Sequence, residues 1–224
     1  KTVSAKVAKG QFNTAYQVLK GALTFALVVG SIAALVVYFG AEFFTATLLK
    51  TPYSIFALKI LGPALVVVAV LGVLRGFFQG LGTMMPSAIS QIIEQIVNAI
   101  ISIWAAYVLT GYGKRIGAVL GDPDHYGAAY GAAGGTLGTN LGAVAGLLFV
   151  LFVFFAYMRV FKRRMRKERN VQVDSFSYTM KILIVTIIPV LLSTTVYNIS
   201  GIIDQGIFKN VALLQGYSDV QIDT

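Results

Sequence analysis

Five long apolar stretches constrain this chain more than any other feature of its sequence. They cover about residues 21–40, 55–75, 84–109, 128–158 and 180–204. Each holds roughly the 20 apolar residues that a helix needs to cross the ~30 Å hydrocarbon core of a bilayer. Because backbone polar groups in hydrocarbon must be satisfied internally, helices are the natural way for such stretches to cross. The sequence therefore predicts an all-α, polytopic transmembrane helical bundle with five spans.

The composition excludes several other classes of protein. Charged residues make up 12% of the chain, against roughly 25% in a typical soluble domain. With no cysteine, neither a disulfide framework nor a thiolate metal site can form. The single histidine, His125, follows an Asp-Pro-Asp sequence that predicts a turn before it predicts a metal site. Since metalloprotease and hydrolase motifs are also absent, we expect no catalytic residue, no metal and no cofactor.

The net charge of +9 is distributed in a way that indicates membrane topology rather than nucleic-acid binding. Seven basic residues cluster between the fourth and fifth spans: Arg159, Lys162, Arg163, Arg164, Arg166, Lys167 and Arg169. Such clusters mark cytoplasmic loops. An even number of spans separates this cluster from Lys1, Lys6, Lys9 and Arg75, which therefore fall on the same side. The sequence predicts that residues 1–19 and 159–178 are cytoplasmic.

This topology divides the chain into four parts. Residues 1–19 form a cytoplasmic connector, 20–158 hold four spans, 159–178 form a basic cytoplasmic loop, and 179–224 hold the fifth span and the start of an external loop. A further external loop is expected over residues 111–126. The odd number of spans and the initial Lys1 lead us to expect that the chain is a piece of a longer polypeptide, whose remainder would complete the structure.

Polar residues follow one face of two of the predicted helices. In the third span they are Ser87, Gln91, Glu94, Asn98 and Ser102, and in the fifth they are Thr186, Ser193, Tyr197, Ser200 and Asp204. Steps of three, four and seven place each set on one helical face. A face turned to lipid gains nothing from polar groups, so both stripes should face other protein or a water-filled cavity. This pattern favours a membrane transporter.

Glu94 is the costliest residue in the predicted membrane. It lies ten residues after Met84, about 15 Å deep at 1.5 Å per residue. A carboxylate there must face a cavity, find a cationic partner or be protonated, and a neutral Glu94 could also join helices by a hydrogen bond. Arg75, predicted to end the second span, could bind a lipid phosphate or simply anchor the helix at the membrane boundary.

Glycines form a ridge in the fourth span. Gly134, Gly138, Gly142 and Gly146 recur at every fourth position. Small residues at this spacing allow another helix backbone to come close in the membrane. The ridge therefore predicts a helix-packing surface.

The segment LRGFFQGLGTMMPSAISQIIEQIVNAI, from Leu74 to Ile100, resembles a family signature. Its pattern RGxxQG followed by PxAxSQxxEQ is similar to polysaccharide-biosynthesis proteins of the multidrug, oligosaccharidyl-lipid and polysaccharide flippase superfamily, which has the MATE-like fold. The likeness is strongest to the branch of stage V sporulation protein B-like proteins and lipid II flippases. SAKVAKG and IVTIIPVLLSTTVYNISGIID resemble two further family segments, so the resemblance covers nearly the whole chain.

This resemblance implies a function and a set of site residues. The five spans would be helices 3–7 of a two-lobed bundle in a bacterial cytoplasmic membrane, with residues 20–158 as helices 3–6 of the N-terminal lobe. Members move lipid-linked saccharides, such as those on undecaprenyl phosphate, from the inner to the outer leaflet. The residues that match the motif and are implied as cavity or gating candidates are Arg75, Gln79, Gln91 and Glu94. The polar stripes add four further candidates: Asn98, Ser193, Tyr197 and Asp204.

Two other functions stay open at this point. A cation-coupled multidrug exporter of the same fold would use Glu94 to bind a proton, sodium or a cationic drug. A non-transporting scaffold in envelope or spore assembly would use the stripes only to join helices. The partners expected are a lipid-linked saccharide and membrane lipids, with a proton, sodium or the membrane potential as driving force.

Overall fold

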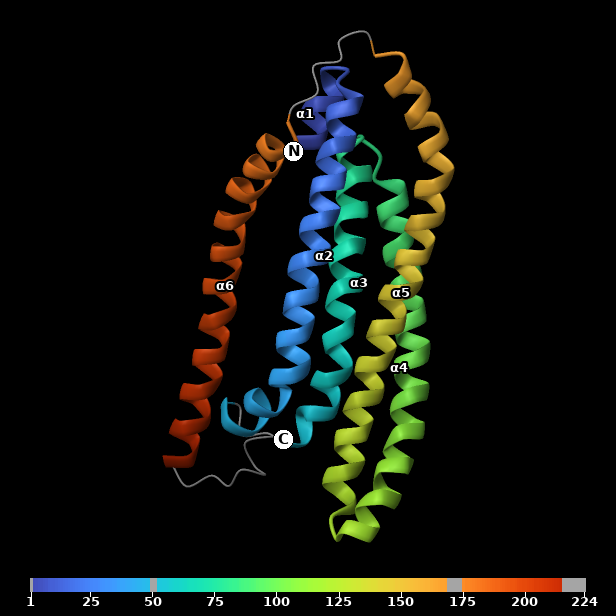
Figure 1. Ribbon diagram of the computed structural model, residues 1–224. Coiled ribbons are helices and arrows are strands. Elements are labelled where there is room, and N and C mark those ends of the chain that lie inside the picture. Colours follow the sequence, from blue (N-terminus) through green and yellow to red (C-terminus); the bar gives the residue numbers. More distant parts are fainter. Residues whose placement is uncertain (1, 49–51, 169–174, 215–224) are drawn as a thin grey trace. The chain divides into compact units, whose positions relative to one another are not determined.

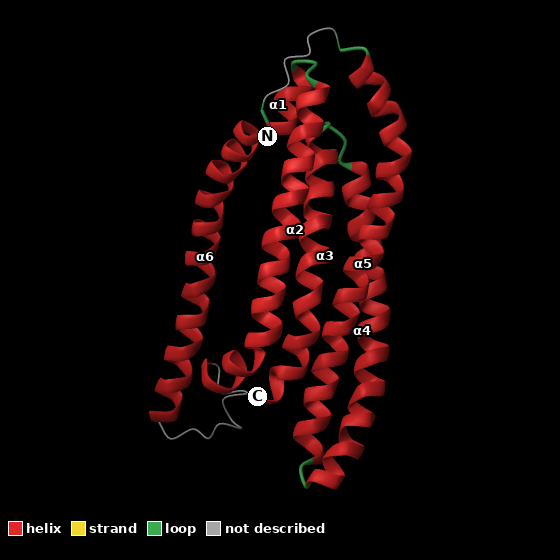
Figure 2. Ribbon diagram, viewed as in Figure 1, coloured by secondary structure: helices red, strands yellow, loops and turns green. Residues whose placement is uncertain are grey.

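The computed structural model describes residues 2–48, 52–168 and 175–214, and these are helices with short connections (Figure 2). In chain order the elements are α1 (Thr2–Ala8), α2 (Phe12–Glu42), a π-helical stretch (Phe43–Leu48), a 3-10 turn (Pro52–Ser54), α3 (Ile55–Gly80), α4 (Met85–Leu120), α5 (Pro123–Arg166) and α6 (Phe176–Leu214). Five helices are long and apolar enough to cross a membrane. The prediction of an all-α polytopic bundle is confirmed.

The chain divides into two compact units, residues 1–176 and 177–224, and each is described by itself. In the first unit α2 packs on α3, α3 on α5 and α5 on α4, so that these four helices form a row (Figure 1). The most extensive contact is between α4 and α5, which run antiparallel as a long hairpin. The second unit consists of nearly all of α6.

An aromatic core closes one end of the first unit, which we call the α1 end. It contains α1, the start of α2, the end of α3, the start of α4 and the end of α5. Phe77 and Phe78 of α3 are 2% and 1% exposed, and Phe77 meets Phe161 of α5 edge to face with ring centroids 5.5 Å apart. Because edge-to-face rings attract each other beyond the effect of burial alone, this cluster fixes α3 against α5.

The structure contradicts the predicted external loop over residues 111–126. α4 continues to Leu120 and α5 begins at Pro123, so that only Gly121 and Asp122 connect them. Gly121 has a φ of +85°, a left-handed conformation that glycine adopts without a steric penalty. The predicted loop included Gly113 and Gly117, but a Cβ on Gly113 would lie 2.5 Å from the backbone oxygen of Tyr126 in α5. A Cβ on Gly117 would lie 2.5 Å from the backbone oxygen of Asp122 in the connection. They are spacing residues in a close helical contact.

Two further boundaries differ from the predicted ones. The basic segment expected as a loop from residue 159 is helical through Arg166, and its cationic side chains lie in the last turns of α5, where they interact favourably with the helix dipole. Arg169 lies outside the described residues. α3 runs on to Gly80, so Arg75 lies inside the helix and not at its end. A Cβ at Gly80 would come within 2.8 Å of Val3, so this glycine makes room for α1.

The outer surface of the row is strongly apolar. Large hydrophobic side chains are exposed along α4, including Ile96, Ile100 and Ile103 at 54%, 66% and 74%, and along α2, including Phe39 at 77%. Contiguous exposed apolar surface of this kind is unstable in water and suits contact with lipid. At ~1.5 Å per residue α4 is about 54 Å long, longer than the ~30 Å hydrocarbon core. Part of the α4–α5 hairpin must therefore extend beyond that core.

Candidate functional site

An ion pair joins α3 to α4 near the α1 end. Nη2 of Arg75 lies 2.7 Å from Oε2 of Glu94. The two side chains are only 15% and 20% exposed. Of the alternatives open for Glu94, the structure therefore shows a cationic partner. A charged hydrogen bond at this distance is stronger than a neutral one, and pairing removes much of the cost of either charge in a membrane.

Two serines complete a cyclic set of hydrogen bonds around the pair. Nε of Arg75 donates to Oγ of Ser90 at 2.8 Å, and Ser90 Oγ donates to the carbonyl of Ser87 at 2.8 Å. Ser87 Oγ in turn donates to the carbonyl of Arg75 at 3.2 Å. Both serines are at most 3% exposed. The guanidinium is thus held in one orientation by its Nε as well as by the carboxylate.

The third helix of this junction is α5, which contributes a glycine. A Cβ at Gly146 would lie 3.2 Å from Nη2 of Arg75 and 3.3 Å from the carbonyl oxygen of Ser90. The missing side chain allows the α5 backbone to cover the ion pair. We call the set Arg75, Ser87, Ser90, Glu94 and Gly146 the polar junction. It connects α3, α4 and α5 at one point.

The polar stripe of α4 continues from the junction along the glycine ridge. Oδ1 of Asn98 lies 2.7 Å from Ser102 Oγ and accepts from Thr139 Oγ1 of α5 at 3.3 Å. Ser102 Oγ is also 2.9 Å from the carbonyl of Gly135. This part of the stripe therefore faces protein, which is one of the two alternatives that its pattern left open.

The four ridge glycines all face α4. A Cβ built on each would have a neighbour in α4, and these neighbours are Ala105 for Gly134, Ser102 for Gly138, Glu94 for Gly142 and Ser90 for Gly146. Gly146 also lies against Arg75 of α3. For Gly134 the nearest atoms are backbone atoms of α4 at 2.6 Å. The ridge and the polar stripe are thus the two sides of the same helix contact.

Other predicted site residues are not brought to the junction. Gln79 of α3 and Gln91 of α4 are exposed on their helices. Ser193, Tyr197 and Asp204 lie on α6, in the unit that is described separately. A cavity shared by the stripes of α4 and α6 is therefore a prediction that these contacts do not test.

Sequence reasoning missed Ser90 and Asn140. Ser90 lies four residues before Glu94, which is about one helical turn. This spacing places both side chains on the same face of α4 and so indicates that they meet the same partner. Nδ2 of Asn140 in α5 donates to the carbonyl of Ile60 in α3 at 2.6 Å. Nothing in the local pattern of α5 indicates this contact, because its partner lies 80 positions away in the chain.

A second polar cluster lies at the tip of the α4–α5 hairpin. The hydroxyl of Tyr53 donates to Oδ2 of Asp122 at 2.7 Å, and Nδ1 of His125 lies 2.7 Å from Oδ1 of the same carboxylate. The hydrogen bond from Tyr53, followed by that from His125, lowers the pKa of Asp122 below its ordinary value. The bond to Asp122 likewise raises the pKa of Tyr53. Among the described residues, no group of three or more His, Cys, Asp or Glu side chains could hold a metal ion.

This cluster predicts a pH-dependent contribution to stability. A depressed Asp122 pKa stabilises the fold above the carboxyl's unfolded pKa, and this contribution is lost as the pH falls below about 4. A raised Tyr53 pKa stabilises the fold below the phenol's unfolded pKa, and this is lost as the pH rises well above about 10. We expect the melting temperature of Tyr53→Phe to lie slightly below that of wild type at pH 7, and the difference to shrink as the pH falls through the lowered pKa of Asp122. A difference that stays the same throughout an acid titration of both proteins would contradict a role for the Asp122 carboxylate.

Comparison with known proteins gives two relatives. The lipid II flippase MurJ of Bacillus subtilis (strain 168) is 32% identical over 117 residues, which are 49% of this chain and 22% of MurJ. Stage V sporulation protein B of the same organism is 26% identical over 180 residues, which are 80% of this chain and 32% of that protein. The chain thus spans less than a third of either relative. No family model and no solved structure matches it.

These relatives confirm the resemblance carried by the segment from Leu74 to Ile100. They are membrane proteins of a flippase superfamily and not enzymes, in agreement with the absence of enzyme motifs from the sequence. The five apolar helices of the chain make it a multi-pass membrane protein. Over these stretches it is similar to two members of the multidrug, oligosaccharidyl-lipid and polysaccharide flippase superfamily, MurJ and stage V sporulation protein B.

Proposed function

We propose that this chain is part of a flippase that moves an undecaprenyl-phosphate-linked saccharide from the inner to the outer leaflet of a bacterial plasma membrane. The observation that carries the proposal is the similarity to a lipid II flippase. The lipid II precursor of peptidoglycan is therefore the first substrate to test, and other lipid-linked polysaccharide precursors share its chemistry.

The polar junction supports a mechanical part for α3, α4 and α5 in such a cycle. Alternating access requires groups of helices to move as bodies around a binding site. The Arg75–Glu94 pair and the Ser90 hydroxyl connect two of these helices through charged hydrogen bonds, and Gly146 allows the third to pack over them. We infer that the three helices move together and that the junction holds them in register.

Residues that could face the transported head group are the polar groups that the junction leaves free. Gln79 and Gln91 are exposed near the junction. We propose that these two side chains face a wet cavity, while the lipid tail stays in the bilayer. Within the second unit, the proposed head-group contacts on α6 are Ser193, Tyr197 and Asp204. Asn98 packs against α5 and has a positioning role in this proposal.

The orientation of the chain follows from its charges. The α1 end holds Lys6, Lys9 and the basic last turns of α5. We propose that this end, with residues 1–19 and 159–178, faces the cytoplasm, since basic clusters are retained on that side. The hairpin tip with Asp122 would then lie outside.

The ion pair argues against the multidrug exporter. That function requires the Glu94 carboxylate to bind a proton, sodium or a cationic drug, but Arg75 already lies 2.7 Å from it. A cation would have to displace a guanidinium that Ser90 also holds. The flippase proposal needs no such displacement.

The test is a leaflet assay on the full-length protein in its host. After depletion of the protein, with redundant flippases removed, we expect the lipid-linked precursor to accumulate in the inner leaflet and wild-type protein to restore its export. Glu94→Gln, checked for correct insertion, should restore it poorly, because a neutral amide pairs weakly with Arg75. A normal outer-leaflet signal after depletion would overturn the lipid II assignment. Full rescue by Glu94→Gln would favour a scaffold role for the stripe.

A further inference from the structure

The backbone hydrogen bonding of α3 is interrupted at Pro63, which lies inside the helix. Proline has no backbone N–H, so the carbonyl of Lys59 cannot accept the usual helical bond from four residues later, and the ring crowds the same carbonyl. Gly62, directly before the proline, meets α2 at van der Waals distance, since a Cβ there would lie 3.4 Å from the carbonyl oxygen of Ala34. This turn is therefore the weakest point in the backbone of α3.

Asn140 of α5 contacts α3 at this interruption. Its Nδ2 donates to the carbonyl of Ile60 at 2.6 Å. A proline within a membrane helix is tolerated where a neighbouring helix supplies hydrogen bonds to the backbone around it. We call Ile55–Gly62 the distal segment of α3, because it lies on the side of Pro63 away from the α1 end. The Asn140 bond connects this segment to α5.

The remainder of α3 is fixed firmly to its neighbours. Phe77 and Phe78 lie in the aromatic core, and Arg75 is held in the polar junction. Both contacts lie on the α1 side of Pro63. This part of α3 therefore stays with α4 and α5.

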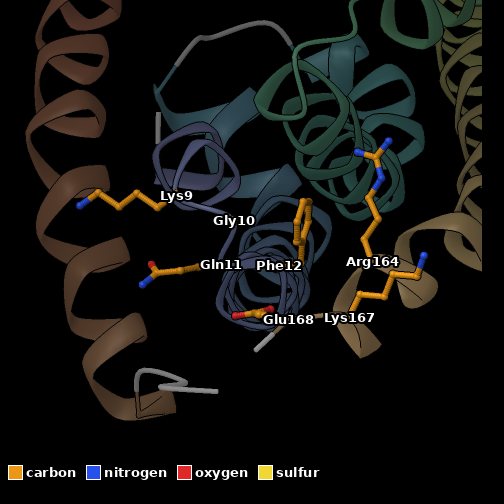
Figure 3. Close-up of a pocket in the computed structure, with 7 residues that line it drawn as sticks. All are labelled: Lys9, Gly10, Gln11, Phe12, Arg164, Lys167 and Glu168. Atoms are coloured by element: carbon orange, nitrogen blue, oxygen red, sulfur yellow. The ribbon is translucent and has the colours of Figure 1, made fainter. Parts of the chain in front are cut away.

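A further contact ties α2 to the residues that end and follow α5. Oε2 of Glu168 accepts from the backbone N–H and the Nδ2 of Asn13, both at 2.9 Å, and the same Nδ2 donates to the carbonyl of Met165 at 3.2 Å. A cavity of about 480 Å³ lies beside this contact, lined by Lys9, Gly10, Gln11, Phe12, Arg164, Lys167 and Glu168 (Figure 3). The α1 end is thus held by polar bonds as well as by its aromatic core.

The distal segment is held more weakly. Besides the Asn140 bond, Phe56 packs on Tyr130 of α5 with ring centroids 4.9 Å apart. Just before the segment, Tyr53 donates to Asp122 at the hairpin tip. Among the described residues, no ion pair holds the segment itself. Its attachment to α5 therefore consists of a neutral hydrogen bond and a ring contact.

The Asn140 amide is only half used in this arrangement. Its Oδ1 is buried and has no hydrogen-bond donor. A buried acceptor without a donor is costly. Movement of the distal segment away from α5 would let water donate to Oδ1, and this gain offsets part of the loss of the Ile60 bond. Asn140 thus holds the segment and also lowers the cost of its release.

We propose that Pro63 is a hinge at which the distal segment of α3 swings away from α5, and that Asn140 is the latch that holds the segment in its closed position. The rest of α3 stays with α4 and α5, as the polar junction requires. The hinge is a property of these helices and does not depend on the lipid II assignment.

The experiment measures amide hydrogen exchange of the full-length protein in lipid nanodiscs, resolved to peptides of α3. Opening of the hinge to water exposes the amides of the distal segment. Pro63→Ala restores a helical donor and should slow exchange in residues 55–62 by about tenfold or more, while residues 66–80 stay unchanged. Pro86→Ala is the matched control, because this proline lies in the first turn of α4, where no helical bond is lost. An unchanged exchange rate in Pro63→Ala would overturn the hinge.

The latch is tested by Asn140→Ala, which removes the Ile60 bond and the packing of the side chain. We expect exchange in residues 55–62 to rise by about three- to tenfold and residues 66–80 to stay unchanged. Thr139→Ala is the control, because this neighbouring hydroxyl bonds to Asn98 of α4 and should not affect α3. Equal acceleration on both sides of Pro63, or none, would overturn the role of Asn140.

The double variant Pro63→Ala with Asn140→Ala separates a latch from a general packing residue. A latch matters only where the hinge can open, so loss of Asn140 should have little effect once Pro63 is replaced. The same acceleration in both backgrounds would show that Asn140 acts independently of Pro63 and would overturn the proposal.

Discussion

Replacing Arg75 with leucine should lower the free energy of unfolding by about 3–5 kcal/mol, since it leaves the largely buried Glu94 carboxylate without its partner. It also removes the Arg75 N–H that donates a hydrogen bond to the hydroxyl oxygen of Ser90. The measurement is an unfolding titration of the detergent-solubilised full-length protein. Glu94→Leu should cost a similar amount, because it isolates the guanidinium in the same way.

The double variant Arg75→Leu with Glu94→Leu is the decisive control. It removes both charges together and should recover most of the stability lost in either single variant, because leucines tolerate this apolar environment. The three variants form a cycle whose coupling energy reports the pair directly. Additive losses would show that Arg75 and Glu94 act independently, in which case the 2.7 Å contact would not hold α3 to α4.

The same pair shows how far the sequence alone can lead. Glu94 stands out because of its depth in an apolar helix, and the sequence leaves its partner open among a cavity, a cation and a proton. Periodicity within α4 reports which residues share a face, but it contains no information on the register between α4 and α3. The sequence therefore identifies both members of the ion pair but not the pair. The helix count, by contrast, depends on hydropathy alone and is predicted in full.

Glycines explain the largest errors in the predicted boundaries. Glycine is typical of turns, and a local pattern cannot distinguish a turn glycine from one that allows helices to approach each other. The glycines concerned are Gly80, Gly113 and Gly117. In the structure all three lie inside helices at close contacts. The cavity at the α1 end was missed for a related reason. It combines residues 9–12 with residues 164–168, which only the packing of α2 on α5 brings together.

The contact between α4 and α5 leads to the second large effect. At Gly134 a Cβ would lie 2.6 Å from the carbonyl carbon and oxygen of Ala105 and from the nitrogen of Ala106. These are backbone atoms that cannot move aside without separating the two helices. We expect Gly134→Ala to lower the free energy of unfolding by about 1–3 kcal/mol, the usual cost of overpacking. The same unfolding titration measures it.

The neighbouring residue provides the matched control. Gly135 has no atom within 4 Å of a built Cβ, so Gly135→Ala should be neutral or should stabilise the helix by up to ~1 kcal/mol through its higher helix propensity. The two variants make the same chemical change at adjacent positions of α5, and only the first points at α4. If both behaved alike, the glycine ridge would act through helix propensity and not through contact. A loss confined to Gly134→Ala would instead establish that van der Waals contact along the ridge joins the hairpin, as expected where lipid removes the hydrophobic drive for helices to associate.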